Sequence, residues 1–114
     1  MRMAFLALGF VLAAAPAGAQ TIGSAEAKAH VGQTVTVEAA VVDVHTVRSG
    51  VTFLDIGGRY PDNDFTAVIF AADAVKFPNV RALAGKTVAI SGPVQLYKGR
   101  PEIVLNAADQ LKVK

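Results

Sequence analysis

The feature that most constrains the fold of this chain is a run of alternating apolar residues that begins after Thr34. Every second position of the run is apolar, at Val35, Val37, Ala39 and Val41. The apolar positions then shift by one residue, to Val42 and Val44. Such alternation indicates a strand with one buried face, and a single shift is what a β-bulge produces. Because a bulge bends its strand, we expect a long curved strand over residues 34–47.

Four further strands are expected from apolar runs bounded by glycine, proline and other turn formers. These strands cover residues 51–56, 65–70, 86–94 and 101–105. A helix-compatible segment at residues 71–77 separates the third strand from the fourth and stops at Pro78. A second short helical segment is expected at residues 24–30, and an extended piece is expected at residues 111–113.

The resulting order, β-β-β-α-β-β, is that of an all-β, five-stranded Greek-key OB-fold barrel with one short helix between strands 3 and 4. An open antiparallel sheet with one helix on a face is the alternative. The first strand favours the barrel, because its length and its bulge allow it to pair with two sheets.

The first 19 residues have the pattern of a secretory signal peptide. Arg2 precedes an uncharged apolar run over residues 3–15, and Ala17-Gly18-Ala19 forms a small-x-small cleavage site. The run is shorter than the roughly 20 apolar residues that span a membrane, so a retained anchor is the weaker alternative. We therefore expect cleavage after Ala19, one domain over residues 20–114, and a periplasmic or secreted protein.

The composition excludes several kinds of chemistry. The chain has no cysteine, which rules out disulfides, Cys-ligated zinc and a thiol nucleophile. Its formal charge of +2 is too small to imply a polyanionic partner by itself. No serine lies in a GxSxG motif, and His30 and His45 lack metal-type spacing. We expect no enzymatic activity, no cofactor and no metal; Asp62 and Asp64 suit turn formation, although a cation there stays open.

Several segments resemble small exported bacterial OB-fold proteins of the nucleic-acid-binding type. FLDIGGRYP at residues 53–61 and FTAVIF at residues 65–70 look like their second and third strands. GKTV at residues 85–88 and YKGRPEI at residues 97–103 resemble their fourth and fifth strands. Similar modules occur fused to nucleases and in proteins related to the tRNA-anticodon-binding type. The resemblance implies single-stranded DNA or RNA as the partner; the periplasmic stress-associated OB-fold proteins fit the pattern less well.

An OB barrel binds ligands on the face of strands two and three and on the loops that frame it. Single-stranded nucleic acid needs flat rings for stacking and cations for phosphates. The residues that meet these needs are Arg48, Arg59, Tyr60, Phe65, Tyr97, Lys98 and Arg100. We expect about three of the four phenylalanines of the domain to be core, and Phe65 to be partly exposed because it opens its strand. Phe53 stays ambiguous, because Phe53 and Leu54 are adjacent and cannot both face inward in a regular strand. In the alternative interpretation, both tyrosines cover barrel ends and the cations are ordinary solvated turn residues.

A second hypothesis is an envelope module that binds a protein, an oligosaccharide or a small cationic ligand. The near-neutral charge and the acids at Asp62 and Asp64 favour it. A continuous positive groove from Arg59 to Arg100 would favour nucleic acid, whereas a mixed or acidic groove would favour this second class. The sequence does not indicate an oligomeric state.

Overall fold

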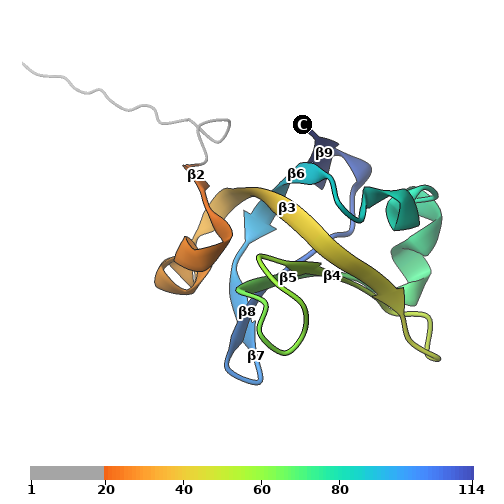
Figure 1. Cartoon of the computed structure of the whole chain (residues 1–114), viewed down its shortest axis with the longest axis horizontal. Helices are drawn as coiled ribbons and strands as arrows, with labels where there is room; N and C mark the ends of the chain where they lie inside the picture. Colours follow the sequence, from red (N-terminus) through yellow and green to blue (C-terminus); the bar gives the residue numbers. More distant parts are fainter. Residues whose placement is uncertain (1–19) are drawn as a thin grey trace, which may run out of the picture.

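The long strand β3 (Thr34–Thr46) is the central element of the computed structural model, which describes residues 20–114 (Figure 1). The signal peptide expected over residues 1–19 lies outside the described residues. The first half of β3 pairs antiparallel with β6 (Thr87–Pro93), and the second half pairs antiparallel with β4 (Thr52–Ile56). One strand therefore belongs to two ladders, as predicted from its length.

The predicted bulge in β3 is confirmed. The register between β3 and β4 shifts between Val41 and Asp43, which is where the apolar pattern changes phase. Val41 and Val44 are both buried, so the strand presents apolar side chains to the core on either side of the shift. The strand curves visibly across the molecule in Figure 1.

The remaining strands complete one sheet of eight strands, whose hydrogen-bonded path runs β7-β8-β5-β4-β3-β6-β9. β5 and β8 run parallel, and β2 pairs parallel with β3 off this path. The bounds are β2 Thr21–Ile22, β5 Phe65–Ile69, β7 Gln95–Tyr97, β8 Arg100–Val104 and β9 Leu111–Val113. The five predicted strands are confirmed in order, and β9 is the extended piece expected at residues 111–113. β2 and β7 are short additions to them.

The hydrogen-bonded path does not close on itself, and its two ends are β7 and β9. Only Val94 separates the end of β6 from the start of β7, and β7 pairs with β8. β6 and β8 are also in contact without forming a ladder. At this seam between β6 and β8 the sheet is therefore not closed by a ladder, and the two strands are joined by the continuity of the chain through β7 and by their contact.

The expectation of one helix between the third and fourth strands is wrong in number and type. The segment forms two short 3-10 helices, η3 (Ala71–Lys76) and η4 (Val80–Leu83). The break falls at Pro78, because proline disfavours the helical conformation at the preceding residue; Phe77 accordingly has φ −131° and ψ 60°. The segments η2 (Ser24–His30) and η5 (Ala108–Gln110) are also 3-10 helices.

Within residues 20–114, no helix combines the length and the apolar character that a membrane span requires.

The burial of the four phenylalanines in the structure differs from the prediction. Phe65 is only 1% exposed, because it pairs with Ile56 and faces inward together with Ala67 and Ile69. Phe77 is also buried, whereas Phe70 is exposed and Phe53 is half-buried on the outer face. Two of the four rings are therefore core, and the expected exposure of Phe65 is wrong. The alternation of inward and outward side chains along the strand decides whether Phe65 faces the core. Its position at the start of the strand does not.

Replacement of Gly92 by alanine is expected to push β6 away from β8 at the seam between these two strands. A Cβ at Gly92 would lie 2.8 Å from Cγ2 of Ile103 on β8, and Gly92 has φ +155°. Steric overlap and backbone strain should together lower the free energy of unfolding by about 2–3 kcal/mol, measured by urea denaturation. Gly85→Ala is the matched control, because Gly85 has φ +87° but open space around its Cβ position. An equal loss in both variants would show that packing at the seam contributes nothing.

Candidate nucleic-acid interface

A row of polar side chains crosses the outer face of the sheet. Direct ladder partners place Asp43, Asp55, Thr66, Glu102 and Gln95 side by side on β3, β4, β5, β8 and β7. Residues directly opposite each other in a ladder share one face, so these five side chains form a continuous line. The face on which the sequence predicted a polyanion site therefore carries three carboxyl groups.

A cavity of about 250 Å³, here called the main pocket, lies over the middle of this row, at Asp55, Thr66 and Glu102. Its walls combine four aromatic rings with two acids and two long-chain cations. The lining residues are His45, Phe53, Asp55, Tyr60, Thr66, Tyr97, Lys98, Arg100, Pro101 and Glu102. The pocket therefore brings together groups that stack, groups that accept hydrogen bonds and groups that bind anions.

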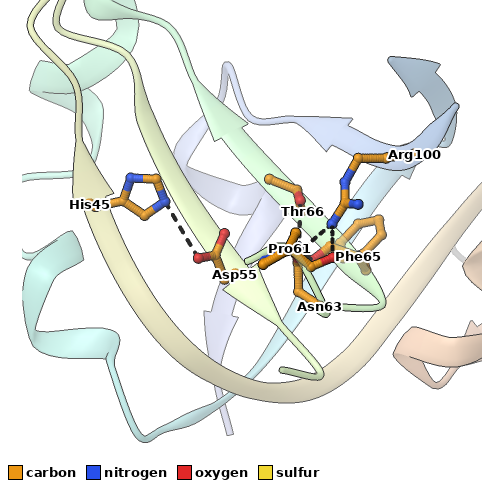
Figure 2. Close-up of polar contacts among 7 residues, drawn as sticks. All are labelled: His45, Asp55, Pro61, Asn63, Phe65, Thr66 and Arg100. Atoms are coloured by element: carbon orange, nitrogen blue, oxygen red, sulfur yellow. Dashed lines mark hydrogen bonds and ion pairs between the residues drawn. The ribbon is translucent and has the colours of Figure 1, made fainter. Parts of the chain in front are cut away.

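The floor of the main pocket is acidic. Asp55 is 2% exposed and Glu102 is 7% exposed. Gln95 donates a hydrogen bond of 2.7 Å to Glu102, but no donor within residues 20–114 makes a hydrogen bond to the Asp55 carboxylate. Its nearest partner is Nε2 of His45, at 3.4 Å (Figure 2). The His45 ring stacks on Phe53, with centroids 5.4 Å apart, and so forms one flat wall.

The rim of the main pocket is aromatic and cationic. Tyr60 and Tyr97 are 67% and 57% exposed. The Arg100 guanidinium lies 5.2 Å from the centroid of the Tyr60 ring, and Nζ of Lys98 lies 5.4 Å from that of Tyr97. Both distances are typical of cation–π contacts. The tight turn at Lys98–Gly99 places Tyr97 opposite Arg100 in the β7–β8 hairpin. Both tyrosine rings at the rim are thus paired with a cation.

Arg100 also ties the loop that follows β4 to the barrel. Its Nη2 donates to the carbonyl of Pro61 at 2.9 Å and to Oδ1 of Asn63 at 2.7 Å. Asn63 is buried, and its Nδ2 donates to the carbonyl of Phe65 and to Oγ1 of Thr66 (Figure 2). The network spans β8, the loop and β5, and it holds Tyr60 at the mouth of the main pocket.

A second hollow of about 270 Å³, the side pocket, adjoins the main pocket. The two share Thr66, Arg100 and Pro101, so they lie side by side along the face. Lys28 and Asp64 line the far part of the side pocket. The face therefore offers a path longer than one pocket, with a cation at its far end.

The structure brings together four of the residues predicted from the sequence: Tyr60, Tyr97, Lys98 and Arg100. Arg48 and Arg59 are exposed and line neither pocket. Phe65 touches the side pocket, but it is buried and offers no face for stacking, which corrects its predicted exposure.

Sequence reasoning missed His45, Phe53, Asp55 and Glu102 as pocket residues. A signal for the first three existed, because the pairs 43/45 and 53/55 occupy alternate positions that point away from the core. Glu102 reaches the pocket through the parallel pairing of β5 with β8, which local periodicity does not reveal.

Within residues 20–114, one group of three side chains has the arrangement to hold a metal ion. It consists of Asp43, His45 and Asp55, whose ligand atoms lie within 4.8 Å of one another. An imidazole with two carboxylates is a donor set that suits zinc or manganese. The spacing of histidines along the sequence does not indicate this group, because its members lie on two paired strands. Asp64 instead accepts a hydrogen bond from Oγ of Ser24, at 3.1 Å.

Asn63→Ala is expected to loosen the loop and to lower stability. The change removes two hydrogen bonds that Asn63 donates and one that it accepts from Arg100. We expect the free energy of unfolding to fall by about 2 kcal/mol, measured by urea denaturation. Asp62→Ala, at the exposed neighbouring position, should change it by less than about 0.5 kcal/mol. Equal values for the two variants would contradict a structural role for the Asn63 network.

Comparison with known proteins identifies the fold. No family model matches the chain, and no curated protein matches it in sequence. Asparaginyl-tRNA synthetase from Entamoeba histolytica matches 85% of this chain with a TM-score of 0.60 and 18% identity, but only 23% of its own length is covered. The same enzyme from Pyrococcus horikoshii matches 81% of this chain with a TM-score of 0.53 and 20% identity, and 22% of its own length is covered.

A third similar structure is that of OBody AM1L10 bound to hen egg-white lysozyme. It matches 83% of this chain and is itself covered over 93%, with a TM-score of 0.63 and 19% identity. The chain thus spans less than a quarter of the two synthetases and nearly all of the OBody. At these identities the likeness concerns the fold alone. It agrees with the strand order found above, so the described part of this chain is an OB-fold domain.

Proposed function

We propose that this chain is an exported module that binds single-stranded nucleic acid across the main and side pockets. The observation that carries the proposal is the pair of exposed rings, Tyr60 and Tyr97, each with a cation beside it at the mouth of a cavity. Stacked bases and neutralised phosphates are the two requirements of a single-strand binder. The predicted signal peptide supports a role outside the cytoplasm.

The charges of the main pocket are separated by depth. Asp55 and Glu102 are buried at the floor, whereas Lys98 and Arg100 lie at the rim. The groove therefore carries charges of both signs. In the sequence analysis, such a mixed groove counted in favour of a protein, an oligosaccharide or a small cationic ligand. The depth of each charge changes that weighing, because phosphates at the rim meet cations while only base edges reach the acids. Few phosphate contacts are available in this arrangement.

The comparisons support this proposal in part. The two synthetases, by their names, act on tRNA, and they contain a domain of the same fold. The OBody is bound to lysozyme, so the fold alone does not choose between nucleic acid and protein. The choice rests on the rings and cations of this chain.

A small cationic ligand is the second candidate, and the buried Asp55 favours it. An ammonium group could pair with the carboxylate while the surrounding rings contact its faces. Lys98 and Arg100 oppose it, since they already lie over the two tyrosine rings. Nucleic acid is therefore the better match to the whole pocket.

The test is a titration of fluorescently labelled 12-nucleotide DNA and RNA single strands at two salt concentrations. About three phosphate contacts predict a slope near −2 of log affinity against log salt. Replacement of Tyr97 and Lys98 together by alanine should weaken binding at least tenfold, because one stacked base contributes about 1–3 kcal/mol.

The control is Arg81→Ala, which removes an exposed cation of η4 that lines neither pocket. This variant should bind within about twofold of the unchanged protein. No binding of either strand at low salt would refute the proposal. Binding without salt dependence would contradict the phosphate contacts at the rim.

A further inference from the structure

We propose that Asp55 makes the main pocket selective for nucleobases that carry an exocyclic amine, and that thymine and uracil are disfavoured there. This inference rests on the proposed function, since it concerns which base enters the same pocket. The carboxylate would accept hydrogen bonds from the N–H groups on the edge of the base. Guanine, cytosine and adenine have such an amine, and thymine and uracil do not.

The carboxylate of Asp55 lacks a donor that a ligand could supply. It is 2% exposed and lines the pocket, yet no donor within residues 20–114 makes a hydrogen bond to it. An ionised carboxylate only accepts hydrogen bonds, and a buried acceptor without a donor is unfavourable. The 3.4 Å approach of His45 leaves most of its acceptor positions unused. A ligand with N–H groups would fill them.

The neighbours of Asp55 in the row extend the same chemistry. Glu102 receives one hydrogen bond from Gln95 and keeps further acceptor capacity. The Thr66 hydroxyl lies between the two acids in the ladder and accepts a hydrogen bond from Asn63, so its own hydrogen is free to donate. The floor thus offers mainly acceptors, with one hydroxyl donor for a ring nitrogen or carbonyl.

The size and polarity of the pocket set the orientation of the base. The volume of about 250 Å³ lies below the roughly 300–1,000 Å³ of sites for drug-sized ligands, and so suits a single base. The stacked His45–Phe53 pair and Tyr97 provide flat walls. With the acids below and the cations above, the donor edge of a base faces Asp55 while its phosphate stays at the rim.

Thymine and uracil fit this floor poorly. Their single N–H group lies between two carbonyl oxygens, which the carboxylate repels. Guanine instead has adjacent N1–H and N2–H groups, which can bind one carboxylate through two parallel hydrogen bonds. A site that hydrogen-bonds one base in this way discriminates against the wrong base by roughly tenfold or more.

The test compares bases that carry an exocyclic amine with related bases that lack it. Unchanged protein is titrated, in the presence of EDTA to keep cations off Asp55, with oligo-dC and oligo-dU. It is also titrated with oligo-dT carrying one central guanine or one central hypoxanthine, which lacks the N2 amine. We expect the amine-bearing strand of each pair to bind roughly tenfold more tightly. Asp55→Asn should reduce both ratios to near one, because an amide offers a donor as well as an acceptor.

Asp43→Asn is the matched control. Asp43 is the ladder partner of Asp55 and belongs to the same metal-capable group, but it does not line the pocket. Its variant should keep both ratios, and thermal unfolding should show that both variants remain folded. Loss of the ratios in Asp43→Asn, or their retention in Asp55→Asn, would overturn direct reading by Asp55.

The comparison on unchanged protein decides the matter even if a variant does not fold. Suppose that all strands bind with equal affinity and that replacement of Tyr97 and Lys98 by alanine still weakens their binding. This result would overturn the base selectivity and leave the proposed function unchanged. Binding of none of the strands at low salt would refute the proposed function itself.

Discussion

The bulge in β3 is the constraint on which both the barrel and the pocket depend. Before the bulge, odd-numbered residues of β3 such as Val41 point into the core. After the bulge, the inward position is even-numbered, at Val44. In a regular strand Asp43 and His45 would continue the inward series. A shift of one residue moves every later side chain to the other face, which places both beside Asp55 on the outer surface. The same bend lets β3 pair with β6 and with β4.

Arg100 fixes the loop at the mouth of the pocket through its hydrogen bonds, and it also contributes a positive charge to the rim. Its guanidinium is bound by Pro61 and Asn63 and lies over Tyr60, so its orientation is set before any ligand arrives. Preorganised groups lose less freedom on binding and so contribute more to affinity. Lys98, by contrast, lies on an exposed turn, and within residues 20–114 its side chain makes one polar or cation–π contact, with the Tyr97 ring. The two rim cations therefore differ in rigidity, although the sequence places them two positions apart.

The parts of the fold that depend on local patterns could be predicted from the sequence. The long first strand and its bulge follow from alternation, and the other four main strands follow from apolar runs bounded by turn formers. The break near Pro78 follows from proline. The helical type was wrong, because short segments packed against a barrel adopt 3-10 turns without the length that favours an α-helix. The direction of Phe65 was also wrong, since it depends on the register with β4. For the site, the tyrosines and their neighbouring cations were predicted, and the outward direction of Asp55 could have been read from alternation. The position of Glu102 beside it could not, because it depends on the parallel pairing of β5 with β8.

The sequence by itself determined the approximate bounds of the five main strands, where β3 bends, and which exposed loops carry rings and cations. Each of these depends on residues within a few positions of one another. Only the tertiary structure decided that Asp55, Thr66 and Glu102 lie in one row beneath those rings. That row needs β5 and β8 to pair in parallel across the intervening chain, and the register of such a pairing is set by packing of the whole core. The charge that a ligand meets at the pocket floor is for this reason a property of the fold.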